Sequence, residues 1–366
     1  MNKLVQLFTI ETNIANRNVG LDIMRSAGVL MVFFVHSLYL FTPHIPQLYK
    51  LSYVLKNGVE VFFGLSGFLI GNILIKLFVV NKDYSYRGIF NFYKRRWYRT
   101  LPLYFFGILL NLLVGYFITG NYKDFNWRFL VFIQNISEAS FWFFPASYSL
   151  SIEEWFYFLF PIGFLIGTLV LKNSPRLNIL LVCIVFILMF TAIRWSKFDN
   201  QIPHWDANIR KSIITRLDCS IYGILMSLFL YSYKDAFKQW KAILLFIGLF
   251  IQGLTIYMHI TMPGSLGNFV FYFNLIPISF VLMIPWLYHL QINNQFTKRM
   301  FTWLGLISFS VYIIHLSPLL ELLNLIKFTN GIQAFFYFMA YVVCIFTFST
   351  LLYKYFEKPL TNLRDK

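Results

Sequence analysis

Long apolar segments, separated by short polar and basic stretches, run through the whole chain. Because a membrane-spanning helix needs about 20 mostly apolar residues, this pattern predicts an all-α, polytopic transmembrane helical bundle with about ten spans. The predicted spans are 20–40, 58–80, 100–120, 146–171, 177–195, 214–232, 242–260, 268–290, 303–324 and 332–353. The stretch 129–144 is partly apolar and is predicted to lie re-entrant or along the membrane interface.

The composition supports the same fold class. Of the 366 residues, 58% are hydrophobic and 13% are charged, whereas a soluble domain carries about 25% charged residues. Aromatic residues reach 21%, which is typical of a lipid-facing surface with aromatic belts. We expect a single membrane domain over residues 1–366, a first span that is retained rather than cleaved, and no appended soluble domain.

The basic residues predict how the chain is oriented. Placing the N-terminus in the cytoplasm puts the tail, 81–99, 172–176, 233–241, 291–302 and the C-terminus inside. Together with Arg25, near the inner end of the first span, these segments hold 20 of the 31 Lys and Arg residues. Cytoplasmic loops are rich in Lys and Arg, so we expect a cell-membrane protein with both termini cytoplasmic. Membrane topology thus explains the net charge of +16, and we predict no nucleic-acid partner.

The cysteines indicate neither a disulfide framework nor a metal site. Cys183, Cys219 and Cys344 are odd in number and lie in or beside apolar runs. Their spacing is not that of metal ligands. We therefore predict no metal and no permanently bound cofactor.

Ionisable residues cluster on one face of the first predicted span. Asp22, Arg25 and His36 fall on this face together with Val29 and Val32, because successive steps of three and four residues return to the same side of a helix. Arg25 and His36 are about 16 Å apart along such a helix. The pattern predicts a charged mouth with a reactive imidazole above it. The alternative is a histidine that only hydrogen-bonds a neighbouring helix.

A second basic group precedes the third predicted span. Arg96 and Arg99 belong to a loop, 81–99, that is expected at the inner face. Arginine suits phosphate because its planar fork donates two parallel hydrogen bonds. These two residues would share a helix face and could bind a phosphate-bearing cytosolic ligand. The alternative is a cluster that only sets topology beside anionic lipid.

Polar residues also enter later spans, where ionisable groups are costly and so are functional candidates. Glu153 and Glu154 open the fourth span, about 100° apart on a helix, so one of them at most should face a given cavity. Further candidates to line the site are Arg216 and Asp218 in the sixth span and Tyr312 and His315 in the ninth. Two histidines and a carboxylate at similar depth would make a general-base site, with His36 and Glu153 as its catalytic candidates.

Glycines mark a close helix contact in the second predicted span. Gly64, Gly67 and Gly71 recur at helical spacing, which lets another helix backbone approach. Glu60, near the outer end of this span, is either interfacial or part of a site.

Read in order, these segments resemble the acyltransferase 3 family of multi-pass membrane acyltransferases. The segments that carry the resemblance are Gly20–Asp22 with Arg25 and His36, Gly58–Gly71, Arg96–Arg99 before Pro102, Tyr148–Pro161, Arg216–Asp218 with Gly223, and Ile307–His315. They cover nearly the whole chain. The sequence departs from the family pattern at Glu60, where aspartate is common, and at Gly64, where a larger apolar residue is usual.

The resemblance implies transfer of an acyl group, most often acetyl, from cytosolic acyl-CoA to a hydroxyl of an envelope glycan or related acceptor. It implies that His36 is the central catalytic residue, that Arg25 forms part of the donor path, and that Arg96 and Arg99 bind the donor. Some members carry an extracytoplasmic hydrolase-like domain. The chain ends shortly after its last predicted span, so we expect it to act alone or with a separate extracytoplasmic transferase.

The main rival hypothesis is a secondary transporter or flippase of an envelope precursor. Intramembrane His, Glu and Arg residues also serve proton relays and substrate paths. We find no paired broken spans and no visible repeat in the sequence, so the acyltransferase hypothesis is preferred.

Overall fold

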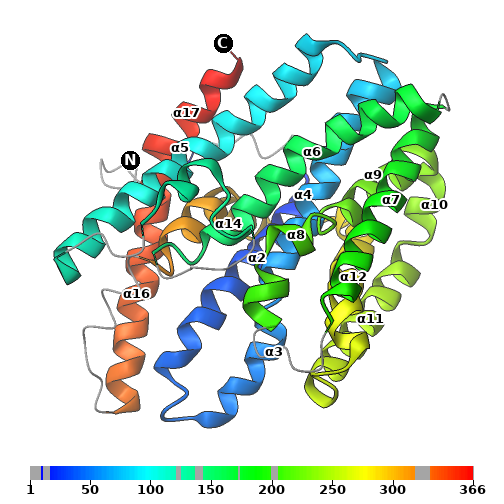
Figure 1. The fold of residues 1–366 in the computed structure, drawn as a ribbon. Helices are drawn as coiled ribbons and strands as arrows, with labels where there is room; N and C mark the ends of the chain where they lie inside the picture. The colour runs from blue at the N-terminus through cyan, green and yellow to red at the C-terminus, as the bar shows by residue number, and fades with distance from the viewer. Residues whose placement is uncertain are drawn as a thin grey trace.

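The computed structural model describes residues 10, 17–120, 125–136, 143–171, 174–198, 205–317 and 330–365. Every regular element in these ranges is a helix, as expected (Figure 1). The longer helices are α2 Val19–Ser37, α4 Gly58–Leu74, α5 Tyr86–Thr119, α6 Ser147–Leu171, α7 Pro175–Ser196, α9 Ile221–Ser232, α11 Lys241–Thr261, α12 Tyr272–Leu282, α14 Gln295–Ile314 and α16 Gly331–Leu352. Shorter elements are η2 Leu38–Leu40, η3 Pro46–Leu51, α3 Ser52–Leu55, η4 Ile75–Val80, η5 Trp127–Val131, η6 Asp206–Arg210, α8 Ile213–Arg216, α10 Lys234–Gln239, η7 Gly267–Phe271, α13 Ile284–Tyr288, η8 Tyr353–Glu357, α17 Lys358–Asn362 and η9 Leu363–Asp365.

Within the described ranges, nine helical segments are long and apolar enough to cross a membrane. Their outward surfaces are strongly apolar: Phe117 is 81% exposed, Leu169 77% and Phe250 72%. Such side chains are costly in water and favourable in lipid. The predicted class, a polytopic helical membrane protein, is confirmed.

Local capping explains where several helices begin. The side chain of Asn18 accepts a hydrogen bond from the backbone N–H of Leu21 at the start of α2. Ser85 does the same for Gly88 in α5, and Asn294 for Phe296 in α14. Each cap satisfies a backbone donor that a helix N-terminus leaves unpaired.

Two of these capped helices begin earlier in the sequence than predicted. Because α5 begins at Tyr86, the stretch 81–99 is mostly helix rather than an inner loop. α14 begins at Gln295, eight residues before the predicted span 303–324, and its first turn carries Lys298. Residues 318–324 of that predicted span lie outside the described residues. The sixth predicted span is divided into α8 and α9.

The helix α4 lies at the centre of the bundle, in contact with α2, α9 and α12. A Cβ added at Gly67 would lie 1.8 Å from the Ser220 carbonyl oxygen, and one at Gly71 would lie 2.7 Å from the Ser227 Cβ. A Cβ at Gly223 of α9 would lie 2.2 Å from the Gly64 carbonyl oxygen. No side chain fits at these contacts, which confirms the predicted close approach of a helix to this glycine face.

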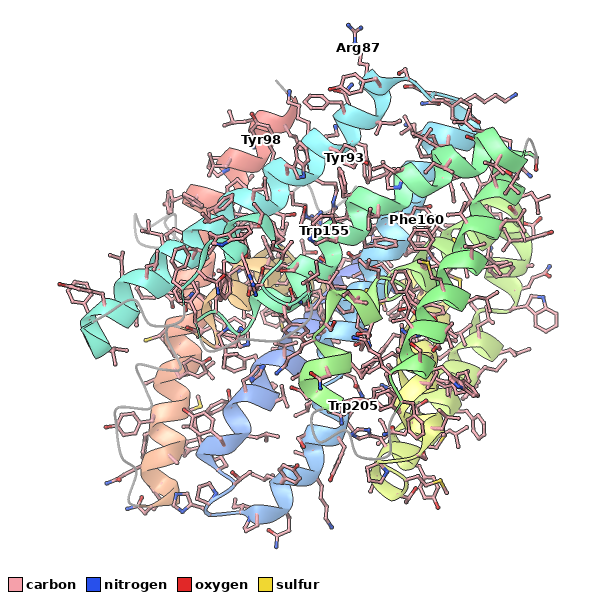
Figure 2. All side chains as sticks on the ribbon, in the orientation of Figure 1. Arg87, Tyr93, Tyr98, Trp155, Phe160 and Trp205 are labelled. Carbon is pink, nitrogen blue, oxygen red and sulfur yellow. The ribbon has the colours of Figure 1, made fainter. Side chains whose placement is uncertain are left out.

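The two ends of the bundle carry different segments. α17 and the beginning of α5 lie at one end, and α3 lies at the other (Figure 1). In Figure 2, Arg87 lies at the first of these ends, and Trp205 lies in the half of the bundle toward the second. Of the predicted interfacial stretch 129–144, the structure describes the end of η5 and a non-helical continuation, while residues 137–142 lie outside the described residues.

Candidate functional site

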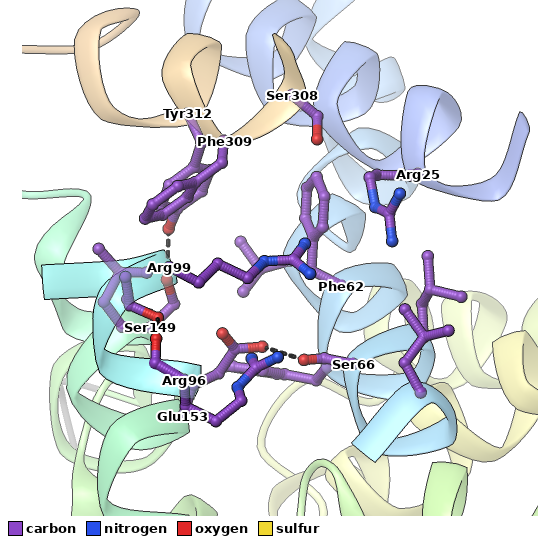
Figure 3. A pocket seen from close by; sticks show the side chains of 16 residues that line it. Arg25, Phe62, Ser66, Arg96, Arg99, Ser149, Glu153, Ser308, Phe309 and Tyr312 are labelled. Carbon is purple, nitrogen blue, oxygen red and sulfur yellow. Dashed lines mark hydrogen bonds between the residues drawn. The ribbon is translucent and has the colours of Figure 1, made fainter. Parts of the chain in front are cut away.

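Three arginines line a cavity inside the bundle. Arg25 comes from α2, and Arg96 and Arg99 come from successive turns of α5 (Figure 3). α4, α6 and α14 complete its walls, and the space between them, together with the open solvent at its mouth, amounts to about 780 Å³. The cavity thus brings together the three arginines that the sequence analysis selected.

The helical form of the basic stretch puts two of these arginines inside the bundle. Arg96 lies ten residues beyond Tyr86, about 15 Å into α5 at 1.5 Å per residue. Arg96 and Arg99 are three residues apart and therefore share a face, as predicted. The guanidinium carbon of Arg96 lies 4.4 Å from the centroid of the Tyr157 ring, and its Nε is buried without a hydrogen-bond partner among the described residues.

Carboxylates balance part of this positive charge. Asp22 is buried and accepts from Arg17 at 2.5 Å and from Arg25 at 3.3 Å. The hydrogen bond to Asp22 raises the pKa of Arg17, which lies just before the first span. Glu153 accepts from the hydroxyl of Ser66 at 2.8 Å. The cavity therefore contains opposite charges, with more arginines than carboxylates in its walls.

The adjacent glutamates of α6 take different directions, as their helical angle predicts. Glu153 lines the cavity with Ser66 and Ser149. Glu154 is not among the lining residues; it is buried, and its Oε1 has no hydrogen-bond partner in the described structure. The sequence analysis placed Arg96 at the inner face and Glu153 at the start of the fourth span, whereas both line this one cavity, because Arg96 lies about 15 Å into α5 and Glu153 lies six residues beyond the start of α6.

His36 does not line the cavity, but it is linked to it through α14. Its imidazole lies 5.3 Å from that of His315, centroid to centroid. The ring of His315 lies 5.8 Å from that of Tyr312, which does line the cavity and whose hydroxyl is 2.5 Å from the Ser149 hydroxyl. The structure thus provides a connected path from the cavity wall to His36.

The hydrogen bonds of His315 define its tautomer. Its Nδ1 lies 2.8 Å from the Tyr312 carbonyl oxygen, which can only accept, so Nδ1 carries the hydrogen. Its Nε2 therefore presents a lone pair, and this atom is buried without a hydrogen-bond partner among the described residues. His315 is 1% exposed. A buried acceptor beside His36 is a suitable group for proton handling.

Two sequence candidates lie away from this cavity. The Arg216 guanidinium donates to Glu60 at 2.7 Å and stacks on Phe273, its central carbon 3.8 Å from the ring centroid. Asp218 accepts from Arg194 at 2.7 Å, and both side chains are fully buried. Arg216 and Asp218 thus join transmembrane helices to one another, and neither lines the arginine cavity.

Sequence reasoning missed several polar partners. Glu357, in η8, is buried and accepts from the Ser310 hydroxyl at 2.6 Å, and η8 packs against α5. Ser66 and Arg194 were not selected either. Ser66 lies between Gly64 and Gly67 in the sequence but at least about 100° from either around the helix, so the glycine pattern did not point to it. Glu357 lies after an apolar run, with no spacing that connects it to α5. Among the described residues, no group of three His, Cys, Asp or Glu side chains could hold a metal ion.

The helices and the cavity define a multi-pass integral membrane protein with a polar, arginine-lined site inside its bundle. Residues 18–354 match the model of a family described as an acyltransferase domain, and the chain belongs to this family. The expected family membership is confirmed.

The chain is also similar to one relative whose name includes a substrate class. The chain is similar to the protein named "Putative peptidoglycan O-acetyltransferase YrhL" of Bacillus subtilis (strain 168), with 24% identity over 374 residues. The similarity covers 93% of this chain and 54% of the relative, so the chain spans about half the relative's length. No solved structure matches.

Proposed function

We propose that this protein transfers an acetyl group from acetyl-CoA to a hydroxyl of a cell-envelope glycan, with peptidoglycan as the first acceptor to test. The observation that carries the proposal is the cavity in which Arg25, Arg96 and Arg99 converge and which Tyr312 and His315 connect to His36. Family membership supports acyl transfer. The name of the Bacillus subtilis relative supports O-acetylation of a wall polymer.

The arginine cavity suits the phosphates of a CoA donor. Guanidinium groups bind phosphate through paired, charge-assisted hydrogen bonds, and the Nε of Arg96 is a buried donor that a phosphate oxygen could satisfy. Glu153, fixed by Ser66, can accept hydrogen bonds from the amides of the pantetheine arm and so orient the thioester. In the proposed orientation, both termini and the donor are cytoplasmic.

His36 would perform the acyl transfer with His315 beside it. As general base, His36 takes the proton of the acceptor hydroxyl while the hydroxyl oxygen attacks the thioester carbonyl. The C–S bond then breaks, and the CoA thiolate leaves and takes a proton. In the covalent variant, the His36 imidazole attacks first and passes the acetyl group to the acceptor. The lone pair of His315 Nε2 would accept a hydrogen bond that orients the His36 ring, or would receive a proton from that ring.

The test uses the full chain reconstituted in phospholipid vesicles. Radiolabelled acetyl-CoA is supplied on the Arg87 side and peptidoglycan fragments on the opposite side, and labelled ester is measured with free CoA. We expect ester and CoA to form in equal amounts, and alkaline treatment to release the label. Movement of fragments across the membrane without consumption of acetyl-CoA would contradict the proposal and favour a transporter.

A further inference from the structure

A group of basic and aromatic side chains lies toward the end of the bundle opposite Arg87, where Trp205 is found (Figure 2). We call Lys56, Arg210 and Lys211 the cationic cluster. Lys56 follows α3, while Arg210 ends η6 and Lys211 follows it. In the proposed orientation this end faces away from the cytoplasm.

Aromatic rings support each cation of the cluster. The Lys56 ammonium lies 5.6 Å from the Trp205 ring and 5.8 Å from the Tyr272 ring, and it also contacts His259 Nε2. The Arg210 guanidinium donates to the Tyr148 hydroxyl at 2.9 Å. Cations held against aromatic faces are partly desolvated, which strengthens their attraction for an anion.

Among the described residues, the three cations of the cluster have one acidic neighbour, Asp206. Asp206 contacts both Arg210 and Lys211, its carboxylate 2.5 Å from the Lys211 ammonium. Burial alone would raise the pKa of Asp206, but these two cations hold it well below its usual range, so Asp206 is ionised. Burial and the charge of Arg210 lower the pKa of Lys211. A bound anion would relieve this unfavourable crowding of positive charge.

The cluster is connected to the proposed catalytic imidazole. Tyr148, which contacts Arg210, directly precedes Ser149, the partner of Tyr312 in the cavity wall. Contacts therefore lead from the cluster to Tyr312, whose ring adjoins His315 and, through it, His36.

We propose that the cationic cluster is an acceptor subsite that binds a carboxylate carried by the glycan, next to the hydroxyl that is acylated. This inference rests on the proposed function, because it treats this end of the bundle as the acceptor side. Carbohydrate rings pack on aromatic faces, and the partly exposed Trp205 lies beside the cations. The enzyme would thus select acceptors that carry a negative charge.

Binding measured without a donor tests the subsite independently of catalysis. The probes are a muramyl disaccharide with a free carboxylate and the same disaccharide as its carboxamide, titrated into the full chain in phosphatidylcholine nanodiscs. We expect the carboxylate to bind about tenfold more tightly, equivalent to about 1.4 kcal/mol. Lys211→Gln and Lys56→Gln should each bring the two Kd values close together, and Lys211→Glu should reverse the preference.

A matched control separates the cluster from general surface charge. Lys50 is an exposed cation of η3 on the same side of the bundle, and Lys50→Gln makes the same change in charge. We expect this variant to keep the preference for carboxylate. Equal loss in Lys50→Gln, or a preference that survives both Lys211→Gln and Lys56→Gln, would overturn the subsite.

Lipid headgroups are the competing source of an anion. Comparing nanodiscs of phosphatidylglycerol, which carry anionic headgroups, with those of phosphatidylcholine distinguishes the lipid from the glycan as that source. A cluster that served only headgroups would show equal Kd values for the two disaccharides in phosphatidylcholine, and this result would overturn the inference. Transfer assays with acetyl-CoA report the proposed function separately. Binding that favours the carboxylate with no acetyl transfer would support the subsite and contradict the acyltransferase proposal. Acetyl transfer with equal Kd values for the two disaccharides would support the acyltransferase proposal and contradict the subsite.

Discussion

The imidazole of His36 lies 5.3 Å from the imidazole of His315, centroid to centroid, although the two residues come from opposite ends of the chain. The contact exists because α2 and α14 pack side by side, where Gly305 lets α14 approach Asp22. His36 is half-buried, and His315 is 1% exposed. The imidazole proposed to be catalytic therefore has a buried neighbour whose tautomer is defined by a hydrogen bond.

Replacing His36 should abolish acetyl transfer without preventing membrane insertion. His36→Ala removes the proposed base or nucleophile, and loss of a general base alone costs typically 10²–10⁴-fold in rate. Labelled ester formed by reconstituted protein is the measurement, with membrane abundance as the check on folding. His44→Ala removes an exposed histidine of the adjoining loop and should keep wild-type activity. Near-normal transfer by His36→Ala would remove the central role assigned to this residue.

His315→Asn tests the unpaired nitrogen of His315. The asparagine amide can still donate to the Tyr312 carbonyl, but it lacks the acceptor at the Nε2 position. We expect kcat to fall at least tenfold while KM for acetyl-CoA stays near the wild-type value, with a changed pH profile of kcat. A purely structural role would instead leave kcat intact in this variant.

Arg96→Ala and Arg99→Ala should weaken donor binding. Each removes a guanidinium from the cavity, and charged hydrogen bonds contribute about 1.5–3 kcal/mol, so KM for acetyl-CoA should rise at least tenfold. Lysine at either position should restore binding only in part, because the two-pronged fork is lost. Arg95 is exposed on the same helix and does not line the cavity, so Arg95→Ala is the matched control. A rise in KM for the glycan alone would exclude a role in donor binding.

The buried pair of Arg194 and Asp218 should be a strong determinant of stability. Asp218→Leu leaves a buried guanidinium without its counter-charge, which costs about 3–5 kcal/mol. We expect a lower unfolding temperature in detergent and less protein in the membrane. The double variant Arg194→Met with Asp218→Leu should recover much of the loss, because an apolar pair needs no compensation. Unchanged unfolding of Asp218→Leu would show that the pair contributes little.

The orientation of the bundle can be tested with single cysteines in a Cys183→Ala, Cys219→Ala, Cys344→Ser background. A thiol reagent that does not cross membranes should label cysteine at Lys50 in intact cells and should label cysteine at Arg87 only after lysis. This outcome follows from the excess of Lys and Arg in the predicted cytoplasmic segments. Labelling at Arg87 in intact cells would invert the topology and place the arginine cavity on the wrong side for cytosolic acetyl-CoA.

The sequence by itself determined the membrane class, most helix positions and the family. Apolar segments of spanning length are a one-dimensional signal, since each transmembrane helix satisfies its own backbone hydrogen bonds. The glycine spacing of α4 likewise predicted a close helix contact, because small residues at helical spacing form a face whatever the partner. The same local rule put Arg96 and Arg99 on one face and separated Glu153 from Glu154.

Only the tertiary structure decided which polar groups share a site. The sequence did not reveal that α5, which is capped at Ser85, includes Arg96 and brings its side chain into the same cavity as Glu153. Arg216 and Asp218, two residues apart, pair with Glu60 and Arg194, because helices that are distant in sequence bring these opposite charges against them. Partners across helix contacts depend on how the helices are rotated and packed, and apolar periodicity in a lipid-facing bundle specifies that rotation only weakly.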